Sequence, residues 1–179
     1  IGDYLFVSKY TYGYSAYSIP FFSPAHAAEG RILEGEVSRG DVVVFRLPSD
    51  TSQDYIKRVV GLPGDRIQVI GGVLHINGTP VKLKRIEDRV VAYDDGETYN
   101  VPRYIETLPN GVSHVVLDSE AGSRFDDTEE FVVPAGHYFM MGDNRDNSID
   151  SRVEQSSGVG MVPAENLVGK AQIILFSWK

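Results

Sequence analysis

The dipeptide Asn77-Gly78 lies between two short runs that are rich in β-branched residues, at positions 73–76 and 79–83. Asn and Gly tolerate the positive φ angles of a type I′ turn, and the twist of that turn matches a pair of antiparallel strands. The segment therefore predicts a β-hairpin. Asn77-Gly78-Thr79 also matches a glycosylation acceptor, but we favour the turn.

The composition extends this prediction to the rest of the chain. Val and Ile number 22 and 12, against 10 Leu and 9 Ala, and β-branched side chains pack well on a pleated surface. We therefore expect a mainly β fold with few helices. The predicted elements include a strand buried on both faces at 41–45, further strands at 54–60, 67–70, 112–117, 137–141 and 171–176, a helical turn at 163–167 and an irregular loop at 10–40.

Charge and cysteine content exclude several classes of protein. The 25 acidic and 17 basic residues leave a net charge of −8. A protein that binds the phosphates of a nucleic acid usually has a net positive charge instead. With no Cys, the chain has no disulfide, no thiolate metal site and no Cys nucleophile.

No run of apolar residues in the sequence approaches the roughly 18 residues of a membrane helix. The start at Ile1 rather than Met indicates a piece of a longer protein, with any targeting or anchoring segment removed.

The predicted strand at 54–60 carries two adjacent cations. Because side chains alternate along a strand, Lys57 shares a face with Tyr55 and Val59, while Arg58 lies on the other face. A lysine on an apolar face loses hydration, which lowers its pKa and allows it to act as a general base. The strand alone leaves a second interpretation open, in which Lys57 extends to water or pairs with an acid.

The segment 142–152 is a dense polar loop with three Asp, two Asn, two Ser and two Arg. A solvated loop is one interpretation. Calcium binding fails on spacing, because an EF-hand-like start at Asp146 lacks the required Gly and Glu. We favour a network of Asp–Arg pairs that holds a hydroxyl in place, because an apolar strand leads directly into the loop.

The four histidines, at positions 26, 75, 114 and 137, are scattered along the chain. No pair has the helical spacing of metal ligands. We expect all four to be structural or surface residues, and we expect no metal site.

Several blocks together resemble the bacterial type I signal peptidases. In chain order they are Gly2-Asp3, 39–45, 55–65, 138–141, 142–152 and 162–169. The resemblance covers about residues 1–70 and 137–179, and the middle stretch corresponds to a part that varies widely in the family. It implies a signal-peptidase-like antiparallel β core formed by 1–69 and 137–179, with a smaller β-rich lobe, 70–136, inserted between them.

Members of this family are membrane-anchored serine peptidases that use a Ser–Lys dyad. They remove signal peptides from exported preproteins at the outer, periplasmic face of the cytoplasmic membrane. On the matching positions, the resemblance implies that Lys57 is the general base and that Ser148 orients its amine. It also implies supporting roles for a group of charged residues, with Asp143 paired to Arg58, Asp150 paired to Arg152, and Arg145 in the same loop.

The resemblance also implies how a substrate binds. An extended signal peptide would pair with the strand that contains Asp54, Tyr55 and Ile56. Leu5, Val44 and Ile56 would help to line shallow apolar pockets for small side chains at the −1 and −3 positions. No cofactor is implied.

One departure concerns the nucleophile. The family places it in a Ser-Met-x-Pro-Thr-Leu-like segment just before the Gly-Asp that stands here at positions 2 and 3, and no Ser-Met pair occurs in this sequence. We therefore expect the chain alone to be inactive. Two alternatives remain open: a non-catalytic relative that binds signal peptides, and a specialised peptidase for pilin or conjugation precursors. The loop at 142–152 and the lack of a DNA-binding segment argue against the self-cleaving repressor peptidases.

Overall fold

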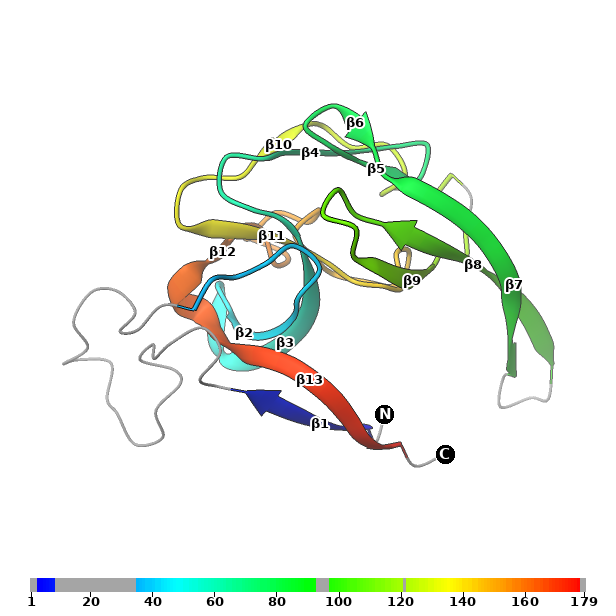
Figure 1. Ribbon diagram of the computed structural model, residues 1–179, viewed down its shortest axis with the longest axis horizontal. Helices are drawn as coiled ribbons and strands as arrows, with labels where there is room; N and C mark the ends of the chain where they lie inside the picture. The colour runs from blue at the N-terminus through cyan, green and yellow to red at the C-terminus, as the bar shows by residue number, and fades with distance from the viewer. Residues whose placement is uncertain (1–2, 9–34, 93–96, 121, 178–179) are drawn as a thin grey trace.

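The computed structural model describes residues 3–8, 35–92, 97–120 and 122–177. Within these ranges the regular structure is almost entirely antiparallel β, which confirms the predicted fold class (Figure 1). The predicted loop at 10–40 lies mostly outside the described residues. The strands are β1 Asp3–Ser8, β2 Val42–Leu47, β3 Asp50–Gly61, β4 Arg66–Ile70, β5 Val73–Ile76, β6 Thr79–Pro80, β7 Lys82–Ala92, β8 Thr98–Thr107, β9 Ser113–Leu117, β10 Phe131–Val132, β11 His137–Met141, β12 Val162–Pro163 and β13 Leu167–Ser177.

The largest sheet has six strands in the order β1-β13-β2-β3-β11-β12. Its first two strands bring the two ends of the described chain together, with Asp3 opposite Ser177 (Figure 1). The prediction that β2 is buried on both faces is wrong. Residues 43, 45 and 47 are buried and the residues between them are half-buried, because the core covers only one face of this antiparallel sheet.

The predicted hairpin is present in a four-stranded sheet with the order β10-β4-β5-β6. Asn77 and Gly78 have φ angles of 54° and 76°, the positive values that a type I′ turn requires. Ile67, Leu74 and Phe139 are fully buried in the core between this sheet and the six-stranded sheet. Burial of this apolar surface, at about 25 cal/mol per Å², stabilises the arrangement of the two sheets.

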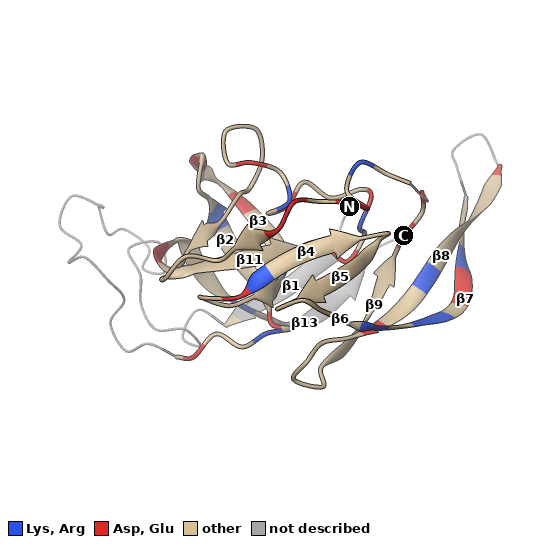
Figure 2. Cartoon of the chain, turned by 90° about the horizontal axis from the view of Figure 1, so that it is seen from above, with Lys and Arg blue, Asp and Glu red and all other residues tan. Residues whose placement is uncertain are grey.

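The third sheet is a ribbon of β7, β8 and β9, and it differs from the other two in its exposure. Lys, Arg, Asp and Glu residues, coloured blue and red, occur along β7 and β8 (Figure 2). The end of the ribbon joins the polar loop 142–152: the Leu117 amide donates to the Asp143 carbonyl, and the Arg145 amide donates to the Leu117 carbonyl. The division into a core and an inserted lobe at 70–136 stays a prediction, and β4 runs across its first boundary.

Helical structure is sparse. In the described ranges it consists of one 3-10 turn, Ala164–Asn166, where a helical turn was predicted. No described helix has the length and apolar character needed to cross a membrane.

Candidate active site

Lys57 lies in β3, in the middle of the six-stranded sheet. It stands opposite Val43 of β2 and two residues before Val59, and both valines are fully buried. Its amine lies 5.9 Å from the centre of the Tyr55 ring. The structure therefore places this lysine on an apolar face, as the alternation of the strand predicted.

Ser148 is the partner of the Lys57 amine. The Nζ atom donates a hydrogen bond of 2.9 Å to Ser148 Oγ, and the serine is 7% exposed. Gly142 makes this contact possible, since a Cβ at that position would overlap the Ser148 hydroxyl. The sequence places Gly142 at the start of the polar loop, but its residue pattern does not indicate this contact.

The surroundings of Lys57 lower the pKa of its amine. Burial is the largest cause, because it disfavours the charged form, and the Arg152 guanidinium acts in the same direction. Asp150 and Asp143 act in the opposite direction and do not outweigh burial. A lysine in this environment releases its proton at a lower pH than an exposed one, so it can accept a proton from a hydroxyl group.

Two ion pairs hold the backbone on either side of this contact. The Arg58 guanidinium donates to both oxygens of Asp143, at 2.8 and 2.7 Å. Arg152 donates to both oxygens of Asp150, at 2.9 and 2.8 Å, and the amide of Gly142 donates to the same carboxylate at 3.0 Å. Both pairings are those that the resemblance implied. Bidentate pairs of this kind fix geometry as well as charge.

A second group of charges joins the loop to the ribbon, and we call it the paired junction: Glu106, His114, Asp143 and Arg145. Glu106 is fully buried and accepts a hydrogen bond of 2.7 Å from Arg145. His114 Nε2 lies 3.3 Å from the same carboxylate and 3.8 Å from Asp143. Burial alone raises the pKa of Glu106, but Arg145 and His114 outweigh it and lower the pKa to about 2.

The sequence pattern does not identify Glu106 as a site residue, and it predicts a structural or surface role for His114. The strand pattern carries a signal for Glu106, because alternation along β8 places it on the same face as Tyr104 and two residues before the buried Leu108, which directly follows the strand. His114 has a side chain that is only 6% exposed, which agrees with the structural role.

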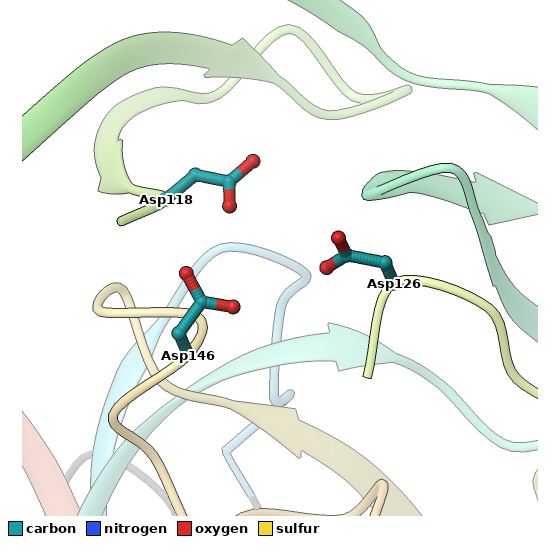
Figure 3. Close-up of side chains that lie close together, drawn as sticks. All are labelled: Asp118, Asp126 and Asp146. Carbon is teal, nitrogen blue, oxygen red and sulfur yellow. The ribbon is translucent and has the colours of Figure 1, made fainter. Parts of the chain in front are cut away.

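A third group, which we call the acidic junction, consists of Asp118, Asp126 and Asp146 (Figure 3). Carboxylate oxygens of the three residues lie within 4.8 Å of one another. Burial and the charges of the other two carboxylates raise the pKa of Asp118 to about 6. Asp146 accepts hydrogen bonds from the amides of Ser119 and Glu120, so this junction also ties the chain after β9 to the loop.

Beside the Lys57–Ser148 contact lies a pocket of about 430 Å³. It is lined by Tyr55, Lys57, Arg124, Phe125, Asp146, Asn147, Ser148 and Ile149.

The residues predicted to bind the substrate do not all line this pocket. Val44 and Ile56 stand directly opposite each other on the other face of the sheet, and Ile56 is 39% exposed. Asp54 forms an ion pair of 3.3 Å with Arg46, and Leu5 lies in β1, with its side chain outside the described part.

The chain is similar to proteins that are already known. The family model "Signal peptidase, peptidase S26" matches residues 1–178. The chain is 46% identical to a signal peptidase I from Rickettsia prowazekii (strain Madrid E), over 99% of its own length and 66% of the relative. It is 42% identical to a signal peptidase I from Rickettsia bellii (strain OSU 85-389), over 99% of its own length and 61% of the relative. A crystal structure of a signal peptidase I from Enterococcus faecalis V583 aligns with a TM-score of 0.42 at 25% identity, covering 75% of this chain and 96% of that one.

A half-buried lysine paired with a serine, in a sheet of antiparallel strands, is thus found in a chain that a peptidase family model matches over almost its whole length. The chain belongs to the signal peptidase family, peptidase S26. It spans somewhat less than two thirds of the length of the relatives that it matches, at 66% and 61% of the two above.

Proposed function

We propose that this chain is the catalytic part of a signal peptidase I, a serine endopeptidase that removes signal peptides from exported preproteins. The observation that carries the proposal is the hydrogen bond of 2.9 Å between the half-buried Lys57 amine and Ser148 Oγ. In its neutral form Lys57 takes the proton from the nucleophilic serine and later activates the water that hydrolyses the acyl-enzyme. Ser148 orients the amine. The nucleophile is the serine of the family's Ser-Met motif, a pair that the 179 residues do not contain.

The free edge of β3 supports the proposed mode of substrate binding. β2 pairs with β3 along one side from Asp50 to Arg58, while β11 pairs on the other side only from Arg58 to Gly61. No described strand covers that other side of the residues before Arg58. An extended peptide can add there by main-chain hydrogen bonds, next to Asp54, Tyr55 and Ile56.

The proposed specificity follows from the size of the side-chain sites. Val44 and Ile56 lie opposite each other and offer a shallow apolar surface, which together with Leu5 would accept small side chains at the −1 and −3 positions. Larger side chains are excluded by overlap. In the family this reaction takes place at the outer face of the cytoplasmic membrane, and we propose the same location for the protein that contains this chain, with anchoring through a segment outside the 179 residues.

The test uses the full-length protein and a purified preprotein. Lys57→Ala is expected to reduce cleavage by at least the 10²–10⁴-fold that general-base catalysis typically contributes. Lys57→Arg should be as inactive, because an arginine side chain stays protonated. Ser148→Ala should have a smaller effect, since it removes only the hydrogen bond that orients the amine.

Lys84→Ala is the matched control, because Lys84 is exposed on β7 and does not line the pocket. Its cleavage rate should equal that of the unchanged protein. Cleavage at the normal rate by Lys57→Ala, with Lys84→Ala as reference, would overturn the proposal.

A further inference from the structure

Phe125 lines the same pocket as Lys57 and Ser148, although it comes from the segment between β9 and β10. Its ring lies close to two guanidinium groups. The Cζ atom of Arg124 is 4.4 Å from the ring centre, and the Cζ atom of Arg152 is 4.8 Å from it. Aromatic rings attract cations at these distances, and the attraction strengthens where water is excluded.

Arg152 connects this ring to the Lys57–Ser148 pair. Its side chain is only 2% exposed, and it donates to both oxygens of Asp150. Asp150 in turn accepts from the amide of Gly142, the residue that lies against the Ser148 hydroxyl. Phe125 therefore covers a buried ion pair that positions the backbone beside Lys57.

The segment that carries Phe125 is held in place from two directions. Asp146, in the polar loop, accepts hydrogen bonds from the amides of Ser119 and Glu120. Asp126 accepts from the amides of Gly122 and Ser123 and so closes the turn next to Phe125. The ring thus sits on a segment fastened to the loop that contains Ser148.

We propose that Phe125 is a positioning residue for the Lys57–Ser148 pair, because its ring keeps water away from the Asp150–Arg152 ion pair and covers part of the pocket wall that it shares with Lys57. The inference rests on the proposed function for its link to catalysis. It assigns a role in that site to a residue from the 70–136 stretch, where the family resemblance is silent.

The direction of the effect on Lys57 follows from its surroundings. Burial is the main reason that the pKa of this amine is lowered, so removal of an apolar group from the pocket wall, which admits more water to the amine, moves the pKa upward, toward 10.5. A higher pKa leaves a smaller neutral fraction of Lys57 at any pH below it. The charged groups around the amine are Asp143, Asp150 and Arg152, with Arg124 and Asp146 further along the pocket wall.

The first experiment measures kcat/KM for preprotein cleavage against pH, in the full-length protein. Phe125→Ala is expected to move the acid limb of the profile upward by about half to one pH unit, and so to reduce the rate on that limb by about 3- to 10-fold. Phe125→Leu keeps an apolar cover and should shift the limb less. Tyr104→Ala is the matched control, because it removes a ring that lies beside Arg85 and does not line the pocket.

The second experiment follows the Lys57 amine directly, by an NMR pH titration of the same full-length variants labelled at lysine. It does not depend on peptidase activity. A higher titration midpoint in Phe125→Ala, with no change in Tyr104→Ala, supports the inference.

An unchanged midpoint and an unmoved acid limb in a folded Phe125→Ala protein would overturn the inference, as would a loss of activity by the same factor at every pH. Failure of the proposed function looks different. In that case Lys57→Ala cleaves normally, whatever the titration shows for the Phe125 variants.

Discussion

The paired junction and the acidic junction are two contacts between the same parts of the molecule, and they use charge in opposite ways. Each joins the 70–136 stretch to the loop 142–152, and each contains a carboxyl group that is fully (Glu106) or partly (Asp118) buried. Glu106 has a pKa of about 2, whereas Asp118 has a pKa of about 6. Burial raises the pKa at both positions, so the sign of the neighbouring charges makes the difference.

The two contacts hold the loop by different interactions. At the paired junction the Glu106–Arg145 attraction itself holds the loop, and removing one partner leaves a buried charge alone. At the acidic junction the hydrogen bonds that Asp146 accepts hold the chain, while the nearby carboxylates oppose them. We therefore expect the first contact to be strong and the second to be under electrostatic strain.

The largest expected effect comes from Glu106→Gln. Arg145 would then be a buried cation without a carboxylate, and the free energy of unfolding should fall by about 3 kcal/mol. For a chain of this size, that corresponds to a loss of about 6–12 °C in Tm. Urea unfolding and thermal melting at pH 7 measure it.

The control for this change is Glu87→Gln, which removes the same charge from an exposed position on β7. It should alter stability by less than about 0.5 kcal/mol. Equal stability of the Glu106 and Glu87 variants would show that the paired junction contributes nothing.

The second prediction concerns how the Glu106 effect depends on pH. The pKa of Glu106 is lowered in the folded state, from 4.5 to about 2, so the folded protein binds fewer protons there than the unfolded chain. Its stabilisation is therefore complete above about pH 4.5 and is lost as the pH falls toward 2. Urea unfolding between pH 6 and pH 3 measures the free energy of unfolding of the unchanged protein and of Glu106→Gln. The difference between the two free energies should become smaller as the pH falls. A stability difference that stays constant over this pH range would contradict the lowered pKa of Glu106.

The smallest expected effect comes from Asp118→Asn, and it has the opposite sign. The pKa of Asp118 is raised in the folded state, from 3.8 to about 6, so stability falls as the pH rises through this window. Replacing the charge should stabilise the protein by about 1 kcal/mol at pH 7, after allowance for screening by solvent, and by almost nothing at pH 4.

Glu129→Gln serves as the comparison for Asp118→Asn, because it removes one exposed negative charge from the same stretch of chain. Melting curves at both pH values separate the two variants. Loss of stability in Asp118→Asn at pH 7 would mean that the carboxylate supports the acidic junction.

Local residue patterns were sufficient to predict much of the fold. The Asn77-Gly78 turn depends on backbone preferences of two residues, and the face of Lys57 depends only on alternation along one strand. Within the loop 142–152, the Asp150–Arg152 pair could be predicted because the two residues are close in sequence, whereas Asp143 and Arg145 find their partners outside the loop. The one-sided burial of β2 could not, since it depends on what the neighbouring sheet covers.

The two junctions could not be predicted from the sequence either, because they also depend on contacts between residues that are far apart in the chain. Glu106 and Arg145 are 39 residues apart, and nothing near either residue marks the other as its partner. Phe125 is a similar case, because its contact with Arg152 depends on how the chain after β9 returns to the loop. The local sequence does not distinguish charged residues that form buried pairs from those that stay in solvent, because the pairing depends on the fold.

The long strand β3 has a consequence for how the protein behaves in concentrated solution. A strand edge that is free to take up a peptide is equally free to pair with the edge of another copy, which is how many sheets begin to aggregate. Here the exposed part of the edge carries Asp50 and polar side chains at 51–54. Those side chains discourage self-association, while the main-chain groups beneath them stay available to any extended chain.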